Sequence, residues 1–315
     1  MWKKCAIALL CISLLFGCNK RGNQGNLRNA GLLVPETISD QVWGTKGYKG
    51  MLKIQSAFEA DVFYREGVTS KPAVENAVSE FEQKGVNVIF GHGNAYAAHF
   101  NDIAPAHPEM HFVSFNGHAT QPNTTSLKFE GYAMGFFGGM TAAYMSRGNK
   151  VGVIAAFGWQ PEVKGFIDGA KHQEHNTEVL VMYTENWDDR DIAIQRFEEM
   201  MAKGADVIYP AGDGFNVPVI EKIKEHGLYA IGYVSDQSDL GESTVLTSTV
   251  QHVDKLYELV AKRFEEGTLE SGNLSFDFKD GVITMGSFSP LVDKAFQEKM
   301  DRHINHYMET GKLPE

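Results

Sequence analysis

Residues 204–232 read GADVIYPAGDGFNVPVIEKIKEHGLYAIG, and this stretch decides the fold. The apolar run at 207–209 has the character of a strand, and the pattern over 217–226 is that of a helix. A second apolar run follows at 229–232. A strand, a helix and another strand at this spacing predict a right-handed βαβ unit, in which both strands lie parallel in one sheet.

The same alternation extends over most of the chain. Strands are expected at 32–34, 61–64, 87–90, 111–115, 151–154, 179–183, 207–209, 229–232 and 245–250, with a strand pair within 274–285. Helices are expected at 44–59, 73–84, 162–172, 191–203, 217–226, 252–267 and 291–311. Continuous apolar strands are typical of sheets that are covered on both faces. The sequence therefore predicts an α/β protein with two doubly wound, Rossmann-like lobes.

The expected segments divide into two lobes between which the chain crosses back. Residues 28–122 with about 251–282 are assigned to the first lobe, and residues 126–250 with about 283–315 to the second. Two similar lobes joined by several crossings are typical of a hinged binding protein. In open α/β sheets, ligands bind at the carboxyl ends of the strands. These ends face each other in such a protein, so a ligand-binding cleft is expected between the lobes.

The composition excludes several classes of protein. The 315 residues contain 29 basic and 40 acidic side chains, for a formal charge of −11, and such a surface repels nucleic-acid phosphates. The cysteines are Cys5, Cys11 and Cys18, so neither a disulfide framework nor a thiolate zinc site is expected. P-loop, HExxH, GxSxG and CxxC motifs do not occur in the sequence. We expect no nucleic-acid partner, no enzyme activity, no metal and no cofactor.

The beginning of the sequence has the pattern of a secretory signal. Lys3 and Lys4 precede an apolar run from Cys5 to Phe16. This run is shorter than the roughly 20 residues that span a bilayer as a helix. The alternative is a buried helix of the fold, which fits poorly because polar, glycine-bearing sequence follows the run directly.

The apolar run ends in LFGC at 15–18, which resembles a bacterial lipobox, although Phe16 is bulkier than usual at its position. We expect residues 1–17 to be a signal peptide that is removed, and Cys18 to carry the lipid anchor, palmitate included. Residues 18–27 are polar and glycine-bearing, which is typical of a flexible tether. This predicts a domain held on the extracytoplasmic face of the cell membrane.

Two glycine patterns stand out. The turn at 91–94 (GHGN) follows a strand and opens a helix, so its amides are placed to face a ligand. It lacks the third glycine of a dinucleotide fingerprint, and a tight turn without a ligand explains it equally well. His92 and Asn94 are candidate site residues on this basis. The glycines at 131, 135 and 139 recur every four residues, which predicts one helical face that packs closely on a neighbour.

Several segments together resemble one protein family. They are 38–43 (ISDQVW), 85–89 (GVNVI), 131–135 (GYAMG), 150–153 (KVGV), 204–208 (GADVI), 230–232 (AIG), 236–237 (DQ) and 246–250 (LTSTV). In this order they are similar to the basic membrane lipoprotein (BMP) family of substrate-binding proteins, which includes purine nucleoside receptors. The resemblance implies a type I periplasmic-binding-protein fold with a hinge. It also implies a nucleoside-like small-molecule ligand and an ABC permease as partner.

Two further runs, 135–143 (GFFGGMTAA) and 209–214 (YPAGDG), resemble the Med branch of this family in bacilli. Proteins of that branch are associated with the regulation of competence. The resemblance therefore leaves a second function open. In it, the chain is a regulatory lipoprotein that acts as a positive regulator of competence without transport, through a membrane regulatory partner.

The nucleoside receptors hold a purine between two aromatic rings and bind its ribose through acidic and amide groups. The resemblance makes Trp43 the first aromatic residue and Phe215 the second, although Trp43 is equally consistent with an ordinary core tryptophan. Asp40 and Asp236 match acids of the family. The full set of expected ligand-binding residues is Asp40, Gln41, Trp43, His92, Asn94, Asn116, Phe215, Asp236 and Gln251.

The chain departs from the family pattern at several positions where that pattern has an acid, an asparagine or a lysine. These positions hold Val34, Gly44, Asn116, Val234 and Gln251. A site with fewer such partners binds ribose hydroxyls more weakly. We expect a polar, aromatic cleft with altered selectivity, or one that no longer serves transport.

Overall fold

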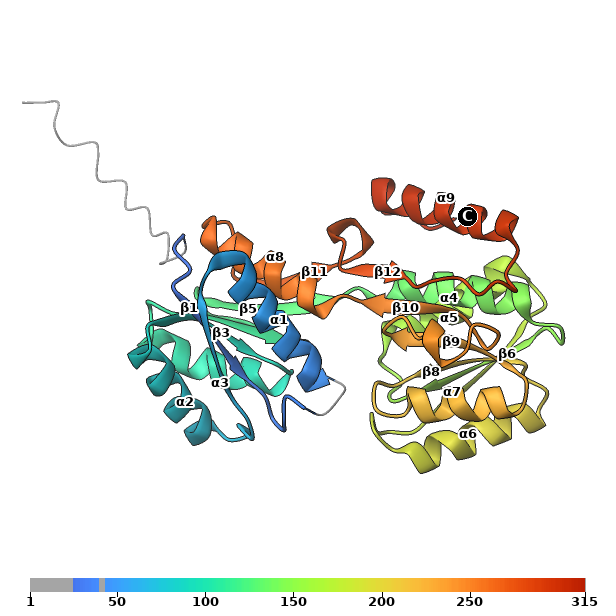
Figure 1. Ribbon diagram of the computed structural model, residues 1–315, viewed down its shortest axis with the longest axis horizontal. Helices are drawn as coiled ribbons and strands as arrows, with labels where there is room; N and C mark the ends of the chain where they lie inside the picture. Colours follow the sequence, from blue (N-terminus) through green and yellow to red (C-terminus); the bar gives the residue numbers. More distant parts are fainter. Residues whose placement is uncertain (1–24, 40–42, 315) are drawn as a thin grey trace, which may run out of the picture.

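The computed structural model of this chain describes residues 25–39 and 43–314. The expected signal peptide and Cys18 lie outside the described residues, as do Asp40 and Gln41. The described chain forms two lobes, each built on its own six-stranded sheet (Figure 1).

The first lobe has the strand order β11-β5-β4-β3-β1-β2, and its described pairings are all parallel. Its strands are β1 (Asn29–Leu33), β2 (Asp61–Arg65), β3 (Val86–Gly91), β4 (His111–Phe115), β5 (Thr124–Phe129) and β11 (Gly272–Phe276). Its helices are α1 (Trp43–Phe58), α2 (Lys71–Gln83), α3 (Ala95–Ile103), η1 (Ala104–Ala106) and α8 (Val253–Glu265). Successive strand residues alternate between the faces, so Val88 and Phe90 pack with α1 and α8, and Ile89 with α2 and α3.

The second lobe has the order β12-β10-β9-β8-β6-β7, in which β12 runs antiparallel to β10. Its strands are β6 (Lys150–Ala155), β7 (Glu178–Tyr183), β8 (Val207–Ala211), β9 (Tyr229–Val234), β10 (Val245–Gln251) and β12 (Ile283–Met285). Its helices are α4 (Gly131–Met145), α5 (Pro161–Gln173), α6 (Arg190–Ala202), α7 (Asn216–Glu225) and the outer α9 (Lys294–Thr310). The short turns η2 (Ser238–Leu240) and η3 (Phe278–Asp280) complete the described elements. The α4–α5 pair covers one face of the sheet and the α6–α7 pair the other.

This architecture confirms the predicted α/β class with two doubly wound lobes, and it corrects two details. β5 pairs with β4 and β11, so the first lobe extends through Phe129 instead of ending at 122. The segment 274–285 is not a strand pair, because β11 belongs to the first sheet and β12 to the second. The chain passes between the lobes after β5, after β10 and between β11 and β12, and these segments form the hinge.

The closest helix–helix contact described is that of α4 with α5, and glycines make it possible. A Cβ at Gly135 would lie 2.1 Å from the Glu162 carbonyl oxygen, and one at Gly139 would lie 2.1 Å from that of Phe166. From the other side, a Cβ at Gly169 would lie 1.9 Å from the Phe136 oxygen. The predicted glycine face is thus confirmed, and the two backbones touch directly. α4 has 15 residues and is an interior helix of the lobe; the described helices all lack the combination of length and apolarity needed to cross a membrane.

The adjacent glycines 138 and 139 allow a matched test of this contact. We expect Gly139→Ala to lower the free energy of unfolding by about 1–3 kcal/mol, because backbone atoms cannot move aside as side chains do. Gly138→Ala places its Cβ 3.4 Å from the nearest atom, a methyl group of Ile231. We expect this control to be neutral or stabilising by up to about 1 kcal/mol, since alanine is the better helix former. Urea denaturation measures both, and equal stability of the two variants would contradict the proposed tight contact.

Candidate functional site

A cleft of about 1160 Å³ lies between the lobes. The described residues that line it on the first lobe come from the loops after β1, β3 and β4 and from β5 and β11. Those on the second lobe come from the loops after β6, β7 and β8 and from the ends of β9 and β10. The carboxyl ends of both sets of parallel strands therefore face this space. This is where open α/β sheets bind ligands, and the volume suits a small molecule.

The structure brings together part of the predicted site. The predicted residues that line the cleft are Trp43, His92, Asn94, Asn116 and Gln251. Asp40 and Gln41 lie outside the described residues. Phe215 and Asp236 do not line the cleft, and both have other partners.

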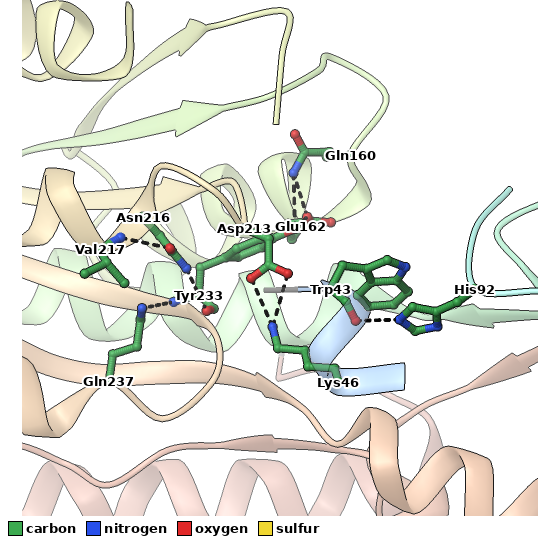
Figure 2. Close-up of polar contacts among 10 residues, drawn as sticks. All are labelled: Trp43, Lys46, His92, Gln160, Glu162, Asp213, Asn216, Val217, Tyr233 and Gln237. Carbon is green, nitrogen blue, oxygen red and sulfur yellow. Dashed lines mark hydrogen bonds and ion pairs between the residues drawn. The ribbon is translucent and has the colours of Figure 1, made fainter. Parts of the chain in front are cut away.

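Trp43 and His92 form one unit on the first lobe. Their rings stack with centroids 4.3 Å apart and an interplanar angle of 11°, and Phe115 meets Trp43 edge-on at 5.7 Å. His92 Nε2 lies 2.6 Å from the Trp43 carbonyl oxygen, to which it donates (Figure 2). Its Nδ1 then accepts from the Tyr257 hydroxyl at 2.8 Å. His92 is fully buried and holds the half-buried Trp43 at the cleft wall, so this tryptophan packs and lines the cleft at once.

The prediction that Phe215 faces the cleft is wrong. Phe215 is fully buried and packs in the core between the second sheet and the α6–α7 pair. Its ring lies against Gly212, where an added Cβ would be 2.1 Å from it. The chain turns inward at this glycine, directly before α7, and carries the ring away from the cleft.

Asp236 is committed to a neighbouring loop. It accepts hydrogen bonds from Ser287 N at 2.9 Å, from Ser287 Oγ at 2.8 Å and from Ser238 N at 3.2 Å. Partial desolvation acts to raise its pKa, but these hydrogen bonds outweigh it, and the pKa of Asp236 lies below its ordinary value. The carboxylate thereby ties the end of β9 to the segment after β12.

Aromatic residues of the second lobe face the cleft from a place that the sequence analysis missed. Trp159 and Trp187 line it, and Phe157 lies beside both. Phe157 stacks on Trp159 at 5.6 Å, and Trp187 meets Trp159 edge-on at 5.8 Å. Trp159 is 66% exposed, an unusual degree for a tryptophan. The available signal was the position of these residues directly after the strands that became β6 and β7.

A buried polar group forms the second-lobe floor of the cleft (Figure 2). Glu162 is 5% exposed and lies in the first turn of α5, at the positive end of the helix dipole. Its Oε1 accepts from the Tyr233 hydroxyl at 2.9 Å and from Gln160 Nε2 at 2.8 Å. Burial, followed by the nearby Glu162 charge, raises the pKa of Tyr233, so this hydroxyl remains a donor.

The backbone at Tyr233 is held from both sides. Gln237 Oε1 accepts from the Tyr233 N–H at 2.8 Å, and Asn216 Nδ2 donates to the Tyr233 carbonyl oxygen at 3.2 Å (Figure 2). The next residue, Val234, lines the cleft with a φ of 64°, a conformation that a β-branched residue rarely adopts. Strain of this kind costs about 1–3 kcal/mol and persists where surrounding contacts enforce it. The hydrogen bonds around Tyr233 supply that enforcement.

An ion pair joins the lobes across the cleft. Lys46 lies one turn into α1, on the same side of the helix as Trp43. Its Nζ lies 3.0 and 3.2 Å from the two carboxylate oxygens of Asp213, in the loop after β8 (Figure 2). Each side chain is 18% exposed, so this pair is better shielded than most surface ion pairs. Within the described residues, no group of three His, Cys, Asp or Glu side chains is placed to hold a metal ion.

The family of ABC transporter substrate-binding proteins described as PnrA-like, Bmp, matches residues 27–315. This chain belongs to the Bmp family. The transcriptional activator protein med of Bacillus subtilis is 55% identical over 301 residues, which cover 96% of this chain and 95% of that protein. The ABC transporter nucleoside-binding protein BmpA of Lactococcus lactis is 23% identical, with 94% of each chain covered.

One solved structure agrees with this assignment, and a second has the same fold. The crystal structure of a transcriptional activator of the comK gene from Bacillus halodurans has a TM-score of 0.87 and 52% identity, covering 91% of this chain and 100% of that one. A solute-binding protein of an ABC transporter system from Aeropyrum pernix has a TM-score of 0.69 at 20% identity, covering 91% and 82%. The predicted BMP family, Med-branch resemblance and type I binding-protein fold are thus confirmed.

The ion pair between the lobes of this Bmp-family chain predicts a measurable effect on their opening. We expect Asp213→Asn to shift the ratio of open to closed lobes roughly fivefold towards open, since such a pair contributes about 1 kcal/mol. Small-angle X-ray scattering checks this as a larger radius of gyration. High salt has the same effect on the unsubstituted protein and little on the variant.

The control is Glu225→Gln, which removes one partner of the Lys222–Glu225 pair within α7, at 2.6 Å. It takes away the same charge and leaves the lobe contact intact. Scattering of Asp213→Asn that is identical to that of this control would show that the pair does not hold the lobes together.

Proposed function

We propose that this chain is a membrane-anchored, extracytoplasmic substrate-binding lipoprotein that captures a nucleoside-like ligand for an ABC-type importer. The observation that carries the proposal is the composition of the interlobe cleft. Trp43 on the first lobe and Trp159 with Trp187 on the second offer ring faces and edges to a planar ligand. Stacking on such rings supplies contact area, and the polar floor supplies hydrogen bonds.

The fold supports capture by closure. The lobes are joined by hinge segments, and a ligand that touches both lobes stabilises their closed arrangement. The name of the Lactococcus lactis relative, a nucleoside-binding protein of an ABC transporter, is consistent with this chemistry. The lipid anchor is proposed from the sequence around Cys18, and with it a location on the outer face of the cell membrane.

A second function is favoured by one observation, the 55% identity to the transcriptional activator protein med. In this alternative, the chain is a regulatory lipoprotein and a positive regulator of competence without transport. A formal charge of −11 repels DNA, so such an effect would pass through a membrane protein partner.

Ligand binding separates the two functions. Full-length protein is purified from membranes in detergent, stripped of carried-over ligand by unfolding and refolding, and titrated with nucleosides by calorimetry. We expect at least one purine nucleoside to bind and to raise the melting temperature. We expect Trp159→Ala to weaken that binding about 10- to 100-fold, because stacking of a base on an aromatic ring contributes about 1–3 kcal/mol.

The matched control is Tyr64→Ala, which removes another exposed aromatic residue, 41% exposed, that is not among the described residues lining the cleft. Trp159 is largely exposed, so its loss leaves the core intact. A folded protein that binds none of the nucleosides would overturn the transport proposal and favour the regulatory one.

The anchor has its own test. We expect intact-mass spectrometry of the membrane fraction to show a chain that begins at Cys18 and carries the added mass of acyl chains. Cys18→Ser removes the acceptor thiol, so the mature lipidated species is expected to vanish. An unmodified chain that retains residues 1–17 in the wild-type membrane fraction would contradict the anchor.

A further inference from the structure

We propose that Glu162 is the specificity-determining residue of the cleft and that it receives a hydrogen-bond donor of the ligand, an O–H or an N–H group. The ligand class is then an uncharged or cationic molecule with such a donor beside a planar ring, and a phosphate placed against Glu162 is disfavoured. This inference rests on the proposed function, because it concerns the same cleft.

The two oxygens of the Glu162 carboxylate differ in their partners. Oε1 accepts both of the described hydrogen bonds, from Tyr233 and from Gln160 (Figure 2). Oε2 receives none from any described residue, although the side chain is 95% buried. The carboxylate is therefore fixed in orientation by one oxygen and presents the other as an acceptor.

Oε2 lies between the start of α4 and the cleft. A Cβ at Gly131, the first residue of α4, would lie 2.8 Å from Oε2. A side chain at position 131 would therefore collide with the carboxylate, and the backbone of Gly131 packs directly beside this oxygen. Among the described residues, Oε2 is not one of the side-chain atoms that are both fully enclosed and unpartnered. Because Glu162 lines the cleft, we infer that this oxygen is open to a molecule bound there.

Basic side chains do not neutralise Glu162 within the described part of the chain. Lys46 is paired with Asp213, and Lys128 lies 3.6 Å from Glu130. Arg190 also lines the cleft, but it forms no ion pair with Glu162. No ion pair with Glu162 is formed by any described residue. A buried carboxylate without a cationic partner repels phosphate and attracts donor groups or positive charge.

The energetic consequence is selectivity. A buried acceptor that loses its partner is penalised far more than an exposed one, because water cannot fully replace the missing donor. A site of this kind rejects a ligand that lacks the matching group. Hydrogen bonds to a charged group correspond to roughly 10- to 100-fold in affinity.

The test combines one substitution with donor deletions in the ligand. Glu162→Gln retains an acceptor oxygen for Tyr233 and Gln160 and replaces the other oxygen with an NH₂ donor. Full-length protein in detergent is titrated with adenosine, purine riboside, 2′-deoxyadenosine, 3′-deoxyadenosine and adenosine monophosphate. Purine riboside lacks the amino group of the adenine base, and each deoxy compound lacks one hydroxyl group of the ribose. Comparing their affinities with that of adenosine therefore shows whether the base or the ribose supplies the donor.

We expect one deletion to weaken binding to the unsubstituted protein about 10- to 100-fold and to have little further effect in Glu162→Gln. Adenosine monophosphate is expected to bind more weakly than adenosine, and Glu162→Gln should reduce this difference in affinity. The control Glu225→Gln removes an exposed acid on α7, outside the residues that line the cleft, and should leave both comparisons unchanged.

The outcomes separate this inference from the function on which it rests. If adenosine binds but no deletion couples to Glu162, the binding function stands and the role of Glu162 is overturned. If neither these five compounds nor any other purine nucleoside binds a folded protein, the nucleoside function fails and this inference fails with it.

Discussion

The direct backbone contact between α4 and α5 is the constraint on which the site depends. Gly135 packs against the backbone of Glu162 itself, and Gly131 against its carboxylate. The same close approach that fills the interior of the second lobe therefore sets where α5 begins. Because Glu162 lies in the first turn of α5, the contact between α4 and α5 both packs the interior of the lobe and positions this acid in the cleft. A larger residue at Gly131 or Gly135 would shift Glu162 relative to Tyr233 and to the first lobe.

The strand pattern was predictable because apolar runs and their spacing are local properties of the sequence. Part of the site was predictable from the family resemblance, as for Asn116, which lines the cleft with a φ of 54° that suits asparagine. Phe215 also follows a strand, but the turn at Gly212 points its ring into the core, and no pattern in the sequence distinguishes the two directions. Lys46 and Asp213 are 167 residues apart, and only the arrangement of the lobes brings them together.

The resemblance to the BMP family implied lost acids at Val34, Asn116 and Val234, which suggested a weakened site. All three line the same cleft as Glu162. The cleft nevertheless contains a buried carboxylate, because Glu162 in the first turn of α5 lines it. In the sequence alone, an acid at the start of a helix is explained by its interaction with the helix dipole. This acid stands on a different element of the fold from the three positions at which the family pattern has an acid.

The ion pair and a bound ligand act on the same equilibrium. Lys46 with Asp213 already favours the closed lobes by a modest amount, and a ligand that spans Trp43 and the second-lobe tryptophans adds its own preference for closure. A ligand shifts the lobes only by its difference in affinity for the two arrangements. Because the pair supplies part of the closing free energy, less is required of the ligand.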